Sequence, residues 1–418
     1  MAPDRLTGGG AAPAPPSPHD PLSRRSRWRA LYDSAPWWAK VLVVFAVSRA
    51  VTTGILLWFA SRQEANAWTG AQPGYFDFAK LWDGHWYYII AVSGYPSELP
   101  ITADGHVGES AWAFMPVYPA VVRTLMLLTG ADFAVAAVVV SVAFAGATAL
   151  MFYRLMNLVL PSSVALFSVV LYCFAPLSPI LQVSYAESLH AFFLTLALYL
   201  LLKRNYLALF PVVAVMSLTR PSGLAFALAL GLHVLYRWFG RRRDPFPPRQ
   251  IAASVGLGLF SVLCGFAWLL IAAAATGSIT AYTDTELAWR MPYIGYRELI
   301  PLTPWFLAAQ FWVPGALGVV LLIFFLAAFA AFMFVPPVKR LGVDMRFWVA
   351  SYVLYLLAVF FPQSSTFRLF LPIFPLLGAL AQPRSPVYRV ALVALCIAGQ
   401  VGWIHIAWWV DGYDWTPP

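Results

Sequence analysis

The stretch LWDGHWYYIIAVSGYP, residues 81–96, decides how the rest of the chain is organised. It follows the first apolar run of membrane-spanning length, yet it is too polar to cross a bilayer, because Asp83 and His85 stand among its aromatic residues. Ile89 and Ile90 would give a helix here one apolar side opposite a polar one. The stretch is therefore predicted to be a helix that lies at the membrane surface.

Two interpretations of Asp83 follow from this placement. A carboxylate beside lipid and among aromatic rings suits chemistry on an amphiphilic substrate, whose tail stays in the bilayer while its head group meets the protein. Alternatively, Trp82, Trp86 and Tyr87 form an interfacial aromatic belt and the carboxylate is simply solvated. The local pattern leaves both open, and the rest of the chain favours the first.

Composition places the chain among polytopic membrane proteins. Hydrophobic residues make up 61% and charged residues 11% of 418 positions, with a mean hydropathy of +0.72, which is more apolar surface than a soluble core can bury. The net charge of +9 comes from basic residues between apolar runs, as in cytoplasmic loops, so no nucleic acid is expected. Cys173, Cys264 and Cys396 lie inside apolar runs and are expected to be core residues rather than a disulfide frame or metal site.

The domain organisation follows from the apolar runs. Residues 1–38 are predicted to be a disordered, basic cytoplasmic tail, and 39–410 a single transmembrane domain. Two segments within it, 61–131 and 275–311, are predicted to be outer loops, and the first carries the candidate catalytic residue. Residues 411–418 would be an outer tail.

The short apolar piece 116–128 decides the number of spans. Pro116 and Pro119 stand at its start and Arg123 in its middle, so we predict a second surface helix instead of a span. About eleven transmembrane helices result, at residues 40–60, 132–153, 162–181, 184–202, 206–218, 222–238, 250–274, 312–335, 346–361, 368–381 and 387–408. This topology puts one set of basic residues on the cytoplasmic side: Arg154, Lys203, Arg204, Arg237, Arg241, Arg242, Arg243, Lys339, Arg340, Arg346, Arg384 and Arg389.

Several ionisable residues interrupt apolar sequence on the other side. Glu187 and His190 are three residues apart at the start of a span, on one helical face. Arg220 lies in LTRPSG, which predicts a hairpin tip, and Arg368 lies at the mouth of a short, proline-interrupted helix. Placing an ionisable side chain within the membrane costs a few kcal/mol unless it is paired or hydrated, so each of these residues is a functional candidate. The alternative is a structural ion pair, such as Glu187 with Arg220. Further ionisable residues on this side are Glu109, Arg123, Asp284, Glu286, Arg290, Arg297 and Glu298.

Arginines at helix breaks are good partners for a phosphate, because a guanidinium and freed backbone groups both donate to it. The implied substrate is a lipid-linked phosphate. A soluble sugar nucleotide fits poorly, since the chain has no Gly-rich phosphate loop, no alternation of strands and helices and no cytoplasmic domain.

The sequence resembles the polytopic glycosyltransferases of the GT-C fold, and within them the PIG-V-type mannosyltransferases and their bacterial relatives. The resemblance rests on five stretches in order: residues 81–96, FMPVYPAVVRTL (114–125), SYAESLHAFFLTLALYLL (184–201), SLTRPSGLAFAL (217–228) and TFRLFLPIFPLL (366–377). It implies an all-α membrane fold in the plasma membrane, an outer-face active site and a polyprenyl-phosphate mannose donor. The acceptor would be lipid- or protein-linked.

The resemblance also assigns roles to residues. Asp83 would be the catalytic base, and Arg220 and Arg368 would bind the donor phosphate. Transfer would occur by a single inverting displacement, with no cofactor required. No second acid adjoins Asp83 as in an Asp-x-Asp pattern, so no metal site is expected, although a divalent metal stays possible. The expected substrate-binding residues are Trp82, His85, Tyr87, Glu187 and His190.

Two other classes of function stay open. A transporter or flippase of a polyprenyl-linked glycolipid would use the same cavity and cations, and inverted repeats would favour it. No such repeat is visible in the sequence. A membrane scaffold would need Asp83 and the arginines only as internal ion pairs.

Overall fold

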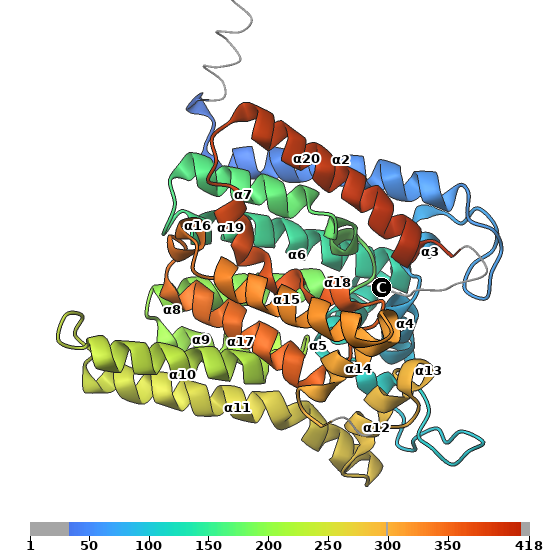
Figure 1. Cartoon of the computed structure of the whole chain (residues 1–418). Coiled ribbons are helices and arrows are strands. Elements are labelled where there is room, and N and C mark those ends of the chain that lie inside the picture. The colour runs from blue at the N-terminus through green and yellow to red at the C-terminus, as the bar shows by residue number, and fades with distance from the viewer. Residues whose placement is uncertain (1–32, 298–299, 411–418) are drawn as a thin grey trace, which may run out of the picture.

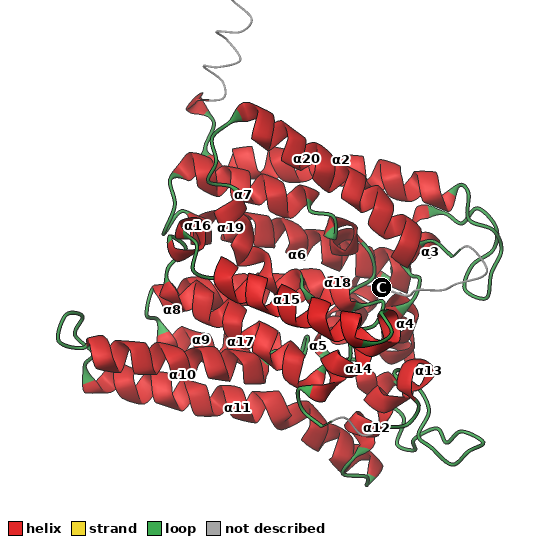
Figure 2. Ribbon diagram, in the orientation of Figure 1, coloured by secondary structure: helices red, strands yellow, loops and turns green. Residues whose placement is uncertain are grey.

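The computed structural model describes residues 33–297 and 300–410. The predictions for the two tails and for Glu298 lie wholly or largely outside these ranges. Within these ranges the regular elements are helices, and the β-pairing is limited to an isolated antiparallel bridge between Ile101 and Val107 (Figure 2). This agrees with the predicted all-α architecture.

Several long apolar helices run through the molecule, which is therefore a multi-pass membrane protein (Figure 1). Five helices among the described residues are long and apolar enough to cross a bilayer: α2 (Trp37–Ala60), α6 (Phe133–Met156), α10 (Gly223–Gly240), α11 (Pro248–Thr276) and α20 with its π-helical end (Pro386–Trp408). Shorter helices complete the bundle: α7 (Ser162–Phe174), α8 (Glu187–Leu202), α9 (Tyr206–Ser217), α14 (Thr303–Trp312), α15 (Ala316–Phe332), α16 (Pro336–Lys339) and α17 (Val343–Val359). The count of eleven spans stays a prediction.

Glycine allows a close contact between α10 and α11. The segment 218–222 separates α9 from α10, and the two helices run as the hairpin that Arg220 and Pro221 predicted (Figure 1). At the start of α10, a side chain added to Gly223 would lie 2.8 Å from the backbone of Gly265 in α11. Small residues permit such close backbone approach between membrane helices.

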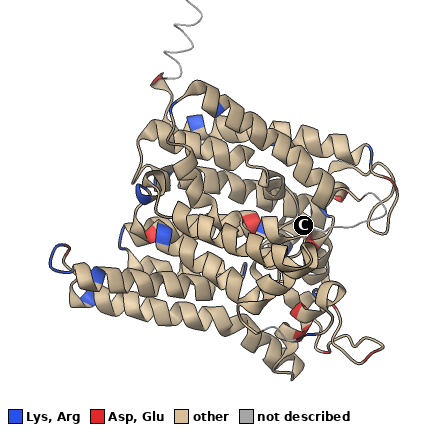
Figure 3. Ribbon diagram, viewed as in Figure 1, with Lys and Arg blue, Asp and Glu red and all other residues tan. Residues whose placement is uncertain are grey.

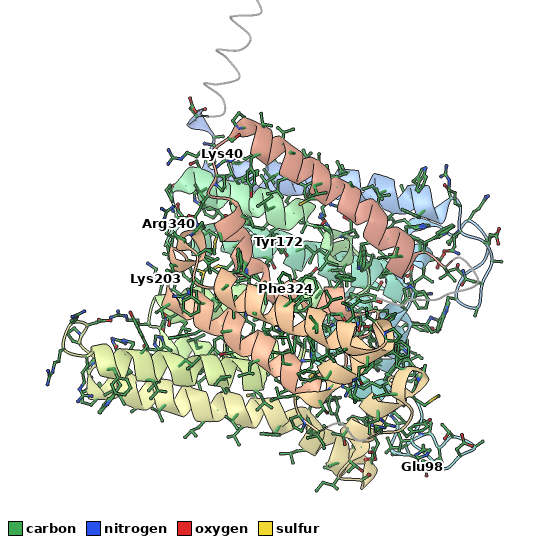
Figure 4. The ribbon with its side chains drawn as sticks, viewed as in Figure 1. Lys40, Glu98, Tyr172, Lys203, Phe324 and Arg340 are labelled. Carbon is green, nitrogen blue, oxygen red and sulfur yellow. The ribbon has the colours of Figure 1, made fainter. Side chains whose placement is uncertain are left out.

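Charged residues mark two ends of the bundle. Figure 3 shows basic residues along the left edge, in the loop after α10 and at neighbouring helix ends. Figure 4 labels Lys40, Lys203 and Arg340 at this end and Glu98 at the opposite one, with Tyr172 and Phe324 between them. This is the distribution that the predicted topology requires, and the membrane side that each end faces stays a prediction.

Two short helices form in the first predicted outer loop. They are α4 (Asp83–Ser93) and α5 (Val117–Thr129), of 11 and 13 residues. At 1.5 Å per residue they extend about 17 and 20 Å, well short of a hydrocarbon core of about 30 Å. Arg123 of α5 donates to the carbonyl oxygen of Ala91 at 3.0 Å, near the end of α4. The arginine thus satisfies a helix C-terminus instead of interrupting a span. The remaining elements here are α3 (Tyr75–Ala79) and η1 (Ala111–Ala113).

Prolines make three predicted spans shorter or more broken than expected. In the predicted span 162–181, the α-helix ends at Phe174, before Pro176, and a 3-10 helix, η2 (Ser178–Gln182), follows. The predicted span 312–335 is helical as α15 only from Ala316, after Pro314, and α14 lies almost wholly in the predicted outer loop 275–311. The predicted 368–381 consists of α18 (Thr366–Leu369), η3 (Leu371–Leu376) and α19 (Leu377–Leu380). Proline lacks the backbone donor that an α-helix needs, so the last turn before it becomes irregular.

Candidate active site

Four charged side chains from distant parts of the chain form one network. Arg368 of α18 pairs with Asp83 of α4, and its Nε lies 3.7 Å from Oε1 of Glu187. Arg220, in the break between α9 and α10, lies 2.7 Å from the same Oε1 through Nη1. The ion pair of Glu187 with Arg220 that the sequence allowed is therefore present. Acids and bases alternate along the network, and their formal charges cancel.

The network is partly exposed at both ends, Asp83 and Arg220, and buried at Glu187 between the two arginines. The side chain of Asp83 is 16% exposed and that of Glu187 only 2%. Oε2 of Glu187 is buried without a hydrogen bond. A small ligand can therefore reach Asp83 and the arginines, while Glu187 lies beneath them and compensates their charge.

The backbone around Asp83 is held in an unusual shape. Trp82, the residue before α4, has φ of 58°, which is rare for a residue with a side chain. Its indole nitrogen donates to the carbonyl oxygen of Trp408 at 3.0 Å. Next to Asp83, a side chain at Gly84 would lie 3.3 Å from Cβ of Ser184. Strain of this kind concentrates where surrounding structure fixes a functional group, here a carboxylate in the first turn of a helix.

Tyr185 connects both ends of the ion pair and was missed by the sequence reasoning. The backbone amide of Asp83 donates to the Tyr185 hydroxyl oxygen at 3.1 Å. The guanidinium carbon of Arg368 lies 5.3 Å from the centre of the Tyr185 ring, within the range of a cation–π contact. Its place two residues before Glu187 in the quoted stretch SYAES was the only available signal.

Tyr87 lies on the same face of α4 as Asp83, four residues further on. Its ring makes edge contacts with Tyr118 at 4.9 Å and Phe114 at 5.3 Å. Burial raises the pKa of its hydroxyl, and the positive charge of Arg220 opposes that rise. The neutral hydroxyl therefore lies near the charged network without carrying charge itself.

His85 is not brought together with this network. It is two residues after Asp83, and a helix puts residues at that spacing on nearly opposite sides. Its ring lies 5.4 Å from that of Trp68. Burial, with the charge of Lys80 second, lowers the pKa of His85. The predicted substrate contact of His85 would therefore have to be made by a neutral ring on the far side of α4.

His190 lies behind Arg220. Its Nε2 is 3.0 Å from the hydroxyl oxygen of Ser222, and that hydroxyl donates to the Arg220 carbonyl oxygen at 3.1 Å. With 1% of its surface exposed, His190 braces the loop that carries the arginine. His190 is therefore linked to the site indirectly, through Ser222 and the backbone of Arg220.

A mostly apolar groove of about 600 Å³ begins next to the network. Phe367, the neighbour of Arg368, lines it together with Pro176 near η2 and Gly399 and Gly402 of α20. A side chain at Gly399 would lie 2.8 Å from Pro176, whereas one at Gly402 would meet no atom within 4 Å. The missing side chain of Gly402 therefore leaves space in the groove.

The candidate residues supply no cluster of metal ligands. Within residues 33–297 and 300–410, no group of three or more His, Cys, Asp or Glu side chains is placed to hold a metal ion. The charge paired with Asp83 is the guanidinium group of Arg368.

Comparisons with known proteins give a structural similarity but no match in sequence. No protein-family model matches the sequence, and no curated protein matches it. Among solved structures, the chain is similar to the Archaeoglobus fulgidus oligosaccharyltransferase, crystallised with a tethered acceptor peptide that contains the NVT sequon. The match covers 87% of this chain and 54% of that chain, with 11% sequence identity and a TM-score of 0.39. The chain thus spans about half the length of that protein.

Proposed function

We propose that this protein is a membrane glycosyltransferase of the GT-C fold. In this proposal it moves a mannosyl residue from polyprenyl-phosphate mannose to a lipid- or protein-linked acceptor, at the outer face of the plasma membrane and with inversion. The observation that carries the proposal is the pairing of Asp83 with Arg368, whose neighbour Phe367 lines an apolar groove. A carboxylate, two arginines and a groove for a hydrocarbon chain are the parts that a lipid-phosphate sugar requires.

The reaction needs one base and a site for the leaving phosphate. Asp83 accepts the proton of the acceptor hydroxyl while the oxygen of that hydroxyl attacks the anomeric carbon. The bond from that carbon to the phosphate oxygen breaks, and the phosphate leaves with the electron pair. Arg368 and Arg220 stabilise the charge that develops on it. Glu187 keeps both guanidinium groups in place from below.

The ion pair also couples donor binding to the availability of the base. In the free protein the guanidinium of Arg368 occupies the Asp83 carboxylate. A bound phosphate would compete for the same guanidinium donors and release an oxygen of Asp83. The carboxylate would then be free to take the acceptor proton when the donor is present.

The apolar groove supports a lipid-linked donor. A polyprenyl chain in the groove would place its phosphate near Arg368, since Phe367, which lines the groove, is next to Arg368 in α18. Of the proposed substrate-binding residues, Tyr87 lies on the Asp83 side of α4 and Trp82 directly precedes that helix, where the sugar and acceptor would meet. His85 would have to contact a substrate from the other side of α4.

The deciding experiment is a transfer assay on purified protein in liposomes. Polyprenyl-phosphate mannose, labelled in the sugar, is supplied with phosphoinositide, mannoside and hydroxyl-peptide acceptors. We expect labelled product with release of polyprenyl phosphate. Movement of labelled donor across the bilayer without any transfer would favour the flippase alternative and overturn the proposal.

A further inference from the structure

A third carboxylate faces the candidate site from the second predicted outer loop. It belongs to Glu286 in α12 (Ala281–Ala288). The helix is held against the first loop by Trp289, whose ring lies 5.6 Å from Trp86 and 6.0 Å from Phe114. The two loops thus pack together through aromatic rings beside the network.

Helical spacing directs Glu286 and Asp83 toward one space. Glu286 precedes Trp289 by three residues, so the two lie on one side of their segment. Asp83 precedes Trp86 by three residues, so these also share a face of α4. Because the two tryptophans touch, the two carboxylates lie on the facing sides of adjacent helices.

Electrostatics agrees with this placement. Burial raises the pKa of the Glu286 carboxyl, while the charges of Arg290 and Arg220 lower it and that of Asp83 raises it. Both the phosphate-binding arginine and the proposed base are therefore close enough to act on Glu286.

Glu286 is more available to a ligand than the other two acids. Its side chain is 30% exposed, against 16% for Asp83 and 2% for Glu187. Its nearest cation, Arg290, is 3.7 Å away, beyond hydrogen-bond distance, and donates instead to the carbonyl oxygen of Val359 at 3.2 Å. The Tyr282 hydroxyl, one turn earlier, also hydrogen-bonds the Glu286 carboxylate. Because a carboxylate has about four lone-pair sites, acceptor capacity remains for a ligand.

The charge pattern selects the kind of group that Glu286 binds. Phosphate belongs beside Arg368 and Arg220, and a carboxylate would repel it. The part of the donor opposite the arginines must then be neutral and able to donate hydrogen bonds. In a sugar phosphate, those groups are the ring hydroxyls.

We propose that Glu286 recognises the sugar of the donor, by accepting hydrogen bonds from hydroxyl groups of a hexose bound between α4 and α12. The proposal rests on the proposed function, because it takes the phosphate site from there. It adds a residue of the second loop that distinguishes a glycosylated donor from the bare lipid phosphate.

The test compares binding of polyprenyl-phosphate mannose with binding of polyprenyl phosphate to full-length protein in nanodiscs. We expect Glu286→Gln to bind bare polyprenyl phosphate like wild type and to lose about tenfold in its preference for the mannosylated lipid, because a charge-assisted hydrogen bond is lost. Asp284→Asn is the matched control on the same helix, two residues away and on its other side. It should retain the preference.

The outcomes separate this inference from the proposed function. If wild type binds neither lipid, the proposed function is wrong and the inference that rests on it is wrong as well. If wild type prefers the mannosylated lipid and Glu286→Gln keeps that preference, the inference is wrong while the proposed function stands. Equal loss of both lipids in Glu286→Gln would also overturn it, since the carboxylate would then support the fold and not the sugar.

Discussion

Arg368 forms an ion pair with Asp83 although 285 positions separate the two residues in the sequence. The pair joins the first predicted outer loop to a broken helix near the other end of the chain. Glu187 extends the connection to Arg220 in the middle of the chain. The candidate site thus exists only when three distant segments are folded together, and each of its charges depends on another.

Asp83→Asn should abolish most transfer activity. The amide keeps the shape of the side chain but cannot take the acceptor proton, so we expect the rate to fall by a factor on the order of 10² to 10⁴. Thermal stability should change little, because the Asp83 side chain is partly exposed and the amide oxygen of Asn can still accept a hydrogen bond from Arg368. Transfer from polyprenyl-phosphate mannose and detergent-solubilised stability are measured side by side.

The matched control for this variant is Asp77→Asn in α3. The Asp77 side chain is 65% exposed and lies 4.0 Å from Lys80, so its loss should leave both activity and stability unchanged. Near-normal transfer by Asp83→Asn would remove the base assignment. A large loss of stability with normal transfer per folded molecule would favour the scaffold alternative.

Replacement of Arg368 or Arg220 by Ala should weaken use of the donor more than use of the acceptor. Each lost charge-assisted contact to phosphate is worth about 1.5 to 3 kcal/mol, so the KM for the donor should rise about ten- to a hundredfold. Steady-state kinetics with each substrate varied in turn gives the two KM values. Unchanged donor kinetics in both variants would contradict the phosphate-binding role.

The buried pair of Glu187 and Arg220 should also contribute to stability. Arg220→Gln leaves the carboxylate of Glu187 with only the longer contact to Arg368, and loss of one partner of a buried pair costs about 3 to 5 kcal/mol. Glu187→Gln in the same chain should recover part of this loss. A double-mutant cycle followed by thermal unfolding measures the coupling, and additive effects would show that the pair is not an energetic unit.

Gly402→Leu should obstruct the groove without disturbing the fold. A side chain at Gly402 meets no atom within 4 Å, and the residue lines the groove. We expect a KM at least about tenfold higher for a long polyprenyl donor. A tenfold change corresponds to the binding free energy lost when about two methylene groups are no longer buried. A donor with only two isoprene units should be little affected.

Gly258→Leu provides the control for the groove. This residue of α11 also has no atom within 4 Å of an added side chain, and it does not line the groove. It should therefore leave both donors unaffected. Equal effects on long and short donors in Gly402→Leu would place the lipid chain elsewhere.

The fold class and the two short helices of the first loop could be predicted from local sequence. Apolar run length separates spans from surface helices, and Arg123 with its neighbouring prolines marked α5 as too interrupted to cross. The ion pair of Glu187 with Arg220 was also foreseeable, because a buried acid and a buried base in one apolar layer need each other. These features depend on the composition of single segments.

Other features depend on how segments pack and could not be read locally. The contact of Asp83 with Arg368 needs the whole bundle in place. The orientation of Glu286 depends on the packing of Trp289 against Trp86. At the basic end, His233 of α10 lies 2.7 Å from Asp344 of α17, a pairing that no spacing in the sequence indicates.

The topology can be tested by cysteine labelling, after Cys173, Cys264 and Cys396 are replaced by Ala. Thr129 ends α5, is exposed, and should lie outside if α5 does not cross the membrane. Thr129→Cys should therefore react with a membrane-impermeant maleimide in intact cells, and Lys203→Cys, at the basic end of α8, only after permeabilisation. If instead Thr129→Cys reacts only from the cytoplasm, α5 or another segment crosses the bilayer. The sides of all helices up to α10 would then be reversed, and the candidate site would no longer open to the outer face.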